Sequence, residues 1–198
     1  MAHLRSVVKA QQFDKAMIEE VFATARTMEH DHPRDALQGK LMATLFYEPS
    51  TRTRLSFEVA MTKLGGSVVG TENAREFSSA AKGESLEDTI RTINQYGVDV
   101  IVLRYNKEGG AERAQNFSDV PIINAGDGPG QHPTQALLDL YTIKKRFGHI
   151  KDLNIALVGD LINGRTVRSL SYFLAKHYAV GRVFLVSPRE TRMRQDIK

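Results

Sequence analysis

The sequence predicts an α/β fold in which a doubly wound parallel sheet carries helices on both faces. Short apolar runs alternate along the chain with longer segments of helical periodicity, and each run is apolar along its whole length. Strands of that kind are buried on both faces, as in parallel sheets with helical crossovers. A break near residues 148–152 predicts a first domain over residues 1–150 and the start of a second α/β domain over residues 151–198.

The first elements follow from periodicity. Apolar residues at helical spacing predict an amphipathic helix over residues 13–30, ending before "HDHP". "KLMATLF" (40–46) predicts a buried strand, and a helix follows over residues 51–64. Gly65 ends that helix, and "SVVG" at 67–70 predicts a short strand.

The middle of the chain repeats the alternation. Ser85 with Asp88 three residues on forms a capping box that opens a helix. "VDVIVLR" (98–104) and "VPIINA" (120–125) predict strands, with a short helix at 112–117 between them.

The last elements include the predicted start of the second domain. Pro133 occupies a first helical position, and that helix ends at Gly148. "LNIALVGD" (153–160) predicts a buried strand, residues 164–178 a helix, and "RVFLVSP" (182–188) another strand.

Composition excludes several classes of function. The chain has no cysteine, which excludes disulfides, thiolate metal sites and a cysteine nucleophile. Its net charge of +4 is spread along the chain, which favours small anionic ligands over nucleic acid. No apolar run reaches the roughly 18 residues of a membrane span, and the N-terminal stretch has no signal-peptide core. We expect a cytoplasmic protein without a nucleic-acid or membrane partner.

Polar clusters follow four of the predicted strands. "YEPSTRTR" follows the first strand, Arg104 ends the third, "GDGPGQHPTQ" follows the fourth and "GDLINGR" the fifth. Ligands of doubly wound sheets bind beyond the carboxyl ends of the strands. We therefore expect the four clusters to converge on one edge of the sheet.

The stretch Ser50 to Thr53 has the properties of a phosphate cradle. Helix-start amides lack intrahelical acceptors and lie at the positive end of the helix dipole. Ser50, Thr51 and Thr53 add hydroxyl donors, and Arg52 adds a planar fork suited to phosphate oxygens.

Each of these candidate site features also has a purely structural interpretation. The cradle could be a capped helix with solvated arginines, an interpretation we adopt for Arg54, which can pair with Glu58. His132 could simply cap a helix. Arg165 opens a helix, where a cation opposes the dipole, and this suggests an anionic ligand. "HDHP" is expected to be exposed, without a metal, and "GDLING" lacks the spacing of a dinucleotide loop.

Two motifs together resemble the carbamoyltransferase family. "FYEPSTRTRLSFE" is similar to the family's motif for the phosphate of carbamoyl phosphate, and "QHPTQALLDLYTI" to its motif for the carbamoyl group. The resemblance runs from about residue 40 to the end of the chain and includes "GDLINGRTV". It implies a carbamoyltransferase that uses no cofactor.

Three features resemble the aspartate-specific branch of the family. Glu48 stands where ornithine enzymes usually have lysine, Lys82 stands where aspartate enzymes have a substrate-binding lysine, and "NAGDGPGQHPTQ" resembles the aspartate version. The implied reaction transfers the carbamoyl group of carbamoyl phosphate to L-aspartate in pyrimidine biosynthesis, giving N-carbamoyl-L-aspartate and phosphate. An ornithine-type enzyme is the alternative within the family.

The resemblance also implies roles for individual residues. The phosphate ligands would be Ser50, Thr51, Arg52, Thr53 and Arg104. Arg52 would stabilise the leaving phosphate. Thr53, Arg104 and His132 would donate to the carbonyl oxygen and stabilise the oxyanion of the tetrahedral intermediate. Gln135 would orient the carbamoyl amide.

The implied acceptor site draws on a second subunit. In the family, the residues matching Ser78 and Lys82 reach into a neighbouring active site, which implies a homotrimer with shared sites. Arg165 would bind a carboxylate of aspartate.

The sequence departs from the family pattern at its end. Family members have a second domain about as large as the first, whereas only two strands of it are present here. We expect little or no transferase activity from this chain alone, and self-association through uncovered strands. The alternative from another class is a non-catalytic subunit that binds carbamoyl phosphate.

Overall fold

The computed structural model describes residues 6–31, 33–72, 74 and 83–195, arranged around two parallel sheets. The strands are β1 (Leu41–Phe46), β2 (Ser67–Thr71), β3 (Val100–Tyr105), β4 (Ile122–Asp127), β5 (Ile155–Val158) and β6 (Val183–Val186). The main sheet has the order β2-β1-β3-β4, and β5 pairs with β6 alone.

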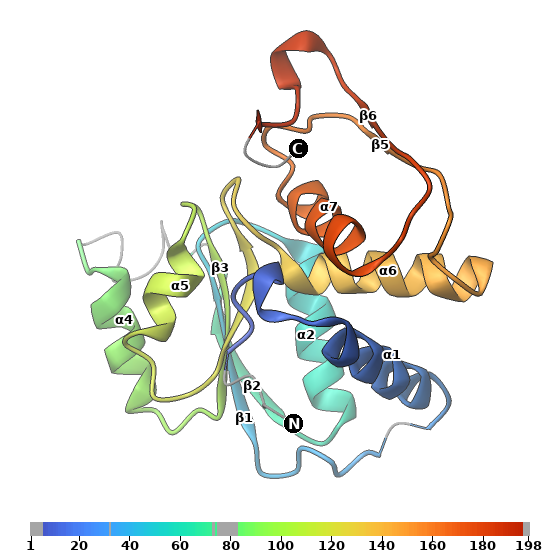
Figure 1. The fold of residues 1–198 in the computed structure, drawn as a ribbon. Helices are drawn as coiled ribbons and strands as arrows, with labels where there is room; N and C mark the ends of the chain where they lie inside the picture. Colours follow the sequence, from blue (N-terminus) through green and yellow to red (C-terminus); the bar gives the residue numbers. More distant parts are fainter. Residues whose placement is uncertain (1–5, 32, 73, 75–82, 196–198) are drawn as a thin grey trace.

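Helices cover both faces of the main sheet, and others lie beside the smaller sheet. The described helices are η1 (Ala10–Gln12), α1 (Lys15–His30), α2 (Thr51–Lys63), α4 (Leu86–Asn94), α5 (Gly110–Gln115), α6 (Pro133–Phe147), α7 (Arg165–His177) and η3 (Arg189–Thr191). Figure 1 shows α4 and α5 on one face of the sheet and α2 on the other. The predicted fold class, a parallel sheet with helices on both faces, is therefore confirmed.

Alternation along the strands divides the core in two. Leu45 and Leu103 pack with residues of α4 and α5, whereas Met42 and Val102 pack on the α2 side. Because side chains two residues apart share a face, Arg104 follows Val102 on the α2 side. The side chain of Arg104, the one cationic residue of β3, therefore lies on the face of the sheet where α2 begins.

The strand order creates a crevice at the carboxyl ends of β1 and β3. β1 pairs with β3 up to Phe46 and Arg104, and the amide of Tyr47 donates to the carbonyl of Arg104 at 2.8 Å. From this point β1 leads through α2 to β2 on one side, while β3 leads through α5 to β4 on the other. Such a reversal of direction is where doubly wound sheets bind ligands.

Some predicted helix boundaries are confirmed and others shift. The first helix ends at His30 as predicted but begins at Lys15 and not at residue 13, because Asp14 caps it by accepting from the amide of Met17 at 2.8 Å. Pro133 begins α6, and Gly148 ends it with a φ of 76°. The predicted short helix at 112–117 instead spans Gly110–Gln115.

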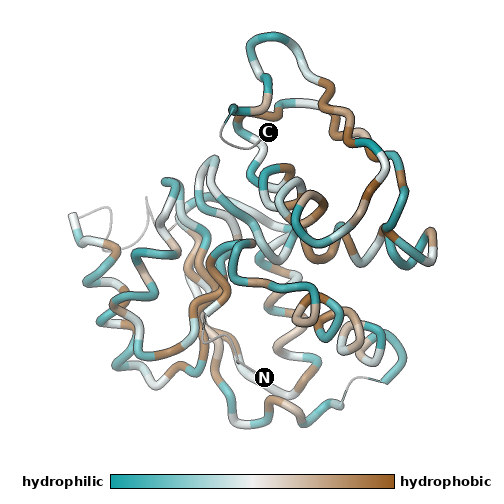
Figure 2. The backbone as a smooth tube through the Cα atoms, viewed as in Figure 1, coloured by the Kyte–Doolittle hydropathy of each residue, from teal (hydrophilic) through white to brown (hydrophobic). Residues whose placement is uncertain are grey.

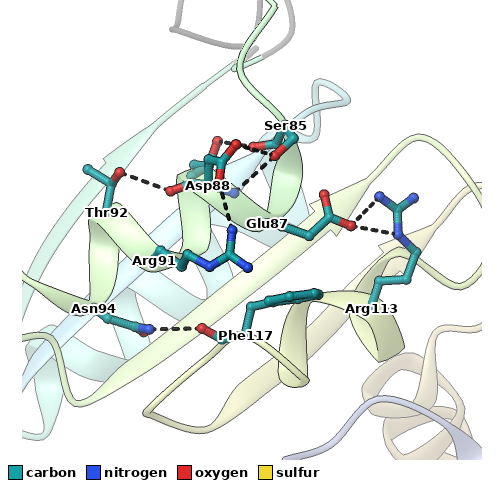
Figure 3. A network of polar contacts seen from close by, with 9 residues as sticks. Ser85, Glu87, Asp88, Arg91, Thr92, Asn94, Arg113 and Phe117 are labelled. Carbon is teal, nitrogen blue, oxygen red and sulfur yellow. Dashed lines mark hydrogen bonds and ion pairs between the residues drawn. The ribbon is translucent and has the colours of Figure 1, made fainter.

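A polar network fixes α4 against α5 (Figure 3). Ser85 accepts from the amide of Asp88 at 3.1 Å, as predicted, but the Asp88 carboxylate accepts from the Ser85 hydroxyl rather than from its amide. Glu87 pairs with Arg113 at 2.5 Å, and the Arg91 guanidinium lies 4.7 Å from the centre of the Phe117 ring.

The prediction of a buried strand at 153–160 is only partly correct, because the strand spans Ile155–Val158 and has one buried residue. Leu157 is buried against the core formed with α7, but Val158 is 70% exposed, and all four residues of β6 are exposed. Figure 2 shows hydrophobic colouring along β5 and β6 as well as along the central strands. Periodicity predicted the strands correctly but could not show that α7 covers only one side of this sheet.

Replacing Gly70 with alanine should destabilise the main sheet. Gly70 lies opposite Thr44, and a Cβ there would be 1.9 Å from Thr44 Oγ1, a fully buried atom that donates to Glu58. We expect G70A to lower the free energy of unfolding by about 2 kcal/mol, measured by urea unfolding. The matched change V69A, at an exposed position, should cost about 1 kcal/mol or less. Equal stability of G70A and the unchanged chain would contradict the packing described.

Lysine at Phe184 and Val186 should reduce concentration-dependent self-association. These side chains are 47% and 49% exposed, on a strand edge that has no partner strand within the described part of the chain. Charges on such edges oppose pairing between copies. Light scattering across a concentration series measures the effect. The control V21K changes an exposed apolar residue of α1. If V21K reduced self-association as much as the β6 substitutions do, β6 would be excluded as the surface through which copies associate.

Candidate active site

A cavity of about 840 Å³ lies at the carboxyl edge of the main sheet. The predicted site residues on its wall are Ser50, Arg52, Thr53, Arg104, His132, Gln135 and Arg165. Thr51, the first residue of α2, is exposed and not on the wall. Ser78 and Lys82 lie outside the described residues. The four polar clusters after the strands therefore do converge, as the topology predicts.

The start of α2 presents hydrogen-bond donors to this cavity. Ser50 is the N-cap, with an extended backbone (φ −161°), but its side chain makes no capping hydrogen bond among the described residues. The hydroxyl is therefore available to a ligand. No acidic residue occupies the first turn, so the positive end of the helix dipole is not neutralised there.

Arg54 takes no part in the cavity. Its guanidinium lies 3.8 Å from Glu58 on the next turn and 3.1 Å from Glu72 beyond β2. This agrees with the structural role expected from the spacing of Arg54 and Glu58. Arg52, two residues earlier, is exposed on the cavity wall.

Glu48 joins two arginines at the edge of the sheet. Its Oε2 lies 3.3 Å from Arg104 Nη2 and 3.2 Å from Arg165 Nη1. Arg104 also donates to the carbonyl of Ala125, and Arg165 to that of Gly128 at 2.8 Å. Burial and the nearby Arg165 lower the pKa of Arg104, while Glu48 opposes this shift. An arginine remains charged, so the pair forms a cationic wall.

Gly126 leaves room for Arg165 to cross the end of β4. Its φ of 113° is unfavourable for residues with a Cβ, and a Cβ there would lie 2.8 Å from Arg165 Nε. The glycine in "NAGDG" therefore has a steric reason that the sequence alone did not reveal.

His132 is the buried N-cap of α6, with 5% of its surface exposed. Its amide donates to Ser169 Oγ at 3.1 Å, and its Nδ1 lies 3.3 Å from Thr134 Oγ1. Burial, followed by the charges of Arg165 and Arg104, lowers its pKa to about 3. The imidazole is therefore neutral near pH 7. If the Thr134 hydroxyl donates to Nδ1, the ring hydrogen is on Nε2, which makes that atom a donor.

Ser169 ties His132 to distant parts of the chain. Its fully buried hydroxyl donates to Gln131 Oε1 at 2.8 Å, and the same oxygen accepts from the amide of Ala10 at 3.3 Å. Ser169, inside α7, and Thr134, in the first turn of α6, were not predicted from the sequence. A single hydroxyl residue in a helix is common and forms no motif that would mark it as functional.

Gln135 and Asp139 face the cavity from successive turns of α6. Gln135 Nε2 donates to Asp139 Oδ1 at 2.9 Å. Burial raises the pKa of Asp139, and the Gln135 hydrogen bond opposes the rise. Asp139 was also missed, because its i+4 spacing from Gln135 is a weak signal that many solvated helices share.

The arrangement is suited to an anion. Three helices, α2, α6 and α7, begin at this cavity, with Arg52, Arg104 and Arg165 beside their positive ends. Across the described ranges, no cluster of histidine, aspartate and glutamate has the geometry to hold a metal ion. No described helix combines the length and apolar character needed to cross a membrane.

Comparison with known proteins agrees with this geometry. The family model "Aspartate/ornithine carbamoyltransferase, carbamoyl-P binding domain" matches residues 5–145. "Aspartate carbamoyltransferase 2, chloroplastic" of Pisum sativum is 58% identical over 199 residues, covering 98% of this chain and 51% of the pea protein. The "Aspartate carbamoyltransferase catalytic subunit" of Methanothrix thermoacetophila is 52% identical over 200 residues, covering 100% of this chain and 64% of the archaeal protein. The chain thus spans about half the length of the plant relatives.

Solved structures give the same result. The aspartate transcarbamoylase of Trypanosoma cruzi in complex with carbamoyl phosphate superposes with a TM-score of 0.90 at 44% identity, covering 98% of this chain and 60% of that one. The catalytic subunit of M. jannaschii aspartate transcarbamoylase superposes with a TM-score of 0.88 at 51% identity, covering 98% and 64%.

The names of the relatives correct one expectation and establish the family. The prediction of a cytoplasmic location is contradicted, because the pea, rice and Arabidopsis relatives, 57–58% identical, are chloroplastic. The matched family model covers most of the chain, and the chain belongs to the aspartate/ornithine carbamoyltransferase family.

Proposed function

We propose that the cavity binds carbamoyl phosphate and that the protein transfers its carbamoyl group to the amino group of L-aspartate. The products would be N-carbamoyl-L-aspartate and phosphate, in a step of pyrimidine biosynthesis. The observation that carries the proposal is that the donors at the start of α2 and those at the start of α6 line one cavity. Relatives solved with carbamoyl phosphate and with aspartate support it.

The phosphate would lie at the start of α2. Ser50, Thr51 and Thr53 would donate from their hydroxyls or amides, and Arg52 would bind the oxygens from the exposed side of the cavity. Arg52 would also stabilise the charge that develops on the departing phosphate. Arg104, held by Glu48, would reach both the phosphate and the carbonyl oxygen.

The carbonyl oxygen would be polarised by Thr53, Arg104 and His132. When the amine attacks the carbonyl carbon, the oxygen becomes an oxyanion, and donors already in place stabilise it without reorganisation. A neutral His132 suits this role because it donates through Nε2 without adding a third positive charge beside Arg104 and Arg165. The intermediate then expels phosphate. Gln135 would orient the carbamoyl amide.

The acceptor would lie on the α7 side of the cavity, where Arg165 would bind a carboxylate of aspartate. Ser78 and Lys82 would come from a neighbouring subunit of a homotrimer. Residues 1–150 would form the carbamoyl-phosphate domain and residues 151–198 part of the aspartate domain, a division supported by the separate sheets. Offering L-aspartate and L-ornithine to the protein, within a full-length chain if required, tests the acceptor: a ureido product from ornithine alone would contradict the proposal.

Loss of Arg52 should strongly weaken the binding of a phosphate-type ligand. We expect calorimetric titration with a phosphonate analogue of carbamoyl phosphate to show binding that is about 100-fold weaker in R52A, because a charge-assisted contact is lost. The matched control R54A removes an arginine from the same helix but outside the cavity, and should keep the affinity. Absence of binding by the unchanged chain, or equal binding by R52A, would contradict the phosphate cradle.

Acid should destabilise the protein partly through His132. With a folded pKa of about 3 and an unfolded pKa of about 6.5, the unfolded chain binds more protons between these values, so stability falls as the pH falls through this window. From pH 7 to pH 5 this contribution is about 2 kcal/mol. The H132Q variant should therefore lose about 2 kcal/mol less over that range.

Urea unfolding at the two pH values measures this difference. The control H149Q removes an exposed histidine and should follow the unchanged chain. An NMR signal showing that His132 becomes protonated near pH 6 would contradict the buried, neutral imidazole.

A further inference from the structure

The cavity contains one carboxylate that the proposed reaction does not use. Asp139 lies on the wall of a cavity that otherwise carries Arg52, Arg104 and Arg165. A negative charge in an anion site weakens anion binding, so its presence calls for a compensating role. Its contact is specific: Asp139 Oδ1 accepts from Gln135 Nε2 at 2.9 Å.

This contact decides which end of the Gln135 amide faces Asp139. An ionised carboxylate only accepts hydrogen bonds, so the amide must turn its NH₂ group toward it. Gln135 Oε1 then points elsewhere, and among the described residues it has no hydrogen-bond partner. Because Gln135 lines the cavity, the unpaired oxygen is an acceptor available to a ligand.

A free acceptor at Gln135 Oε1 favours acyl phosphates whose acyl group carries a hydrogen-bond donor. A carbamoyl group carries an NH₂ that can donate to Gln135 Oε1, whereas an acetyl group has a methyl in the same place. If the amide were reversed, its NH₂ would face the ligand NH₂, and two donors would oppose each other.

We propose that Asp139 is a positioning residue that fixes the Gln135 amide with its oxygen toward the ligand, and so makes the site prefer an acyl phosphate that bears NH₂ over one that bears methyl. The inference rests on the proposed function, because it assumes that an acyl phosphate occupies this cavity. Asp139 acts through Gln135 and need not touch the reacting atoms.

Two stable phosphonates of equal charge test the proposal. Phosphonoacetamide and 2-oxopropylphosphonate share the phosphonate and the carbonyl and differ only in NH₂ against methyl. The ratio of their dissociation constants, measured by calorimetry, cancels effects of a substitution on phosphate binding or on general stability. We expect the protein to prefer the amide about tenfold, as for one hydrogen bond.

Substitutions at Asp139 should change this ratio in a graded way. D139N should reduce the preference about threefold, because asparagine donates as well as accepts and permits both amide orientations. D139K should reduce the ratio to about one, because lysine only donates and would turn the amide round. Q135A should likewise give about one, since the acceptor is gone. The matched control T142A, on the exposed part of α6 outside the cavity, should keep the tenfold ratio.

Each outcome decides between possibilities. A tenfold preference retained by both D139N and D139K would overturn the inference and leave an ordinary i, i+4 helix pair. If the unchanged protein bound both phosphonates equally well, the inference about Asp139 would be overturned, but the proposed phosphate site would still be supported. Binding of neither would overturn the proposed function and this inference together. The graded loss, with the control unchanged, would establish Asp139 as the positioning residue.

Discussion

The candidate site depends on offsetting the repulsion between positive groups that gather at one edge of the main sheet. Three helices begin there, and Arg104 and Arg165 extend into the same space, so the helix dipoles and the two guanidinium groups all present positive charge. Glu48 bridges the two arginines and offsets part of their repulsion. Glu48 therefore lets the two guanidinium groups lie close together at this edge.

Much of this could be predicted from the sequence because it follows from topology. Apolar runs separated by helical periods predict a parallel sheet, and the carboxyl ends of parallel strands meet on one edge. That rule places Arg52, Arg104, His132 and Arg165 together without any knowledge of side-chain contacts. Gly148 and Pro133 marked the ends of α6 because each has a backbone reason to be there.

The remaining features depend on contacts between segments far apart in the sequence. The hydroxyl of Ser169 meets Gln131 and His132 only after α7 packs beside α6. Likewise, an apolar run predicts a strand but says nothing of what covers its faces. The expectation of uncovered strands after residue 150 came from the resemblance to longer family members, and the run itself did not single out Val158 as exposed. Asp139 was hidden for a different reason: i, i+4 acid–amide pairs are common on solvated helices.

The central place of β1 in the sheet has a consequence for how the chain folds during synthesis. β1 is the first strand to be made, yet it pairs with β2 on one edge and β3 on the other, and the partner residue of Met42 on β3 is Val100. Parallel pairing across such separations is slow, because the chain loses loop-closure entropy before the contacts that stabilise the paired strands can form. A nascent chain can pair β1 with β2 first, but the other edge of β1 has no partner until β3 has left the ribosome. During that interval the exposed edge favours aggregation and chaperone binding over folding.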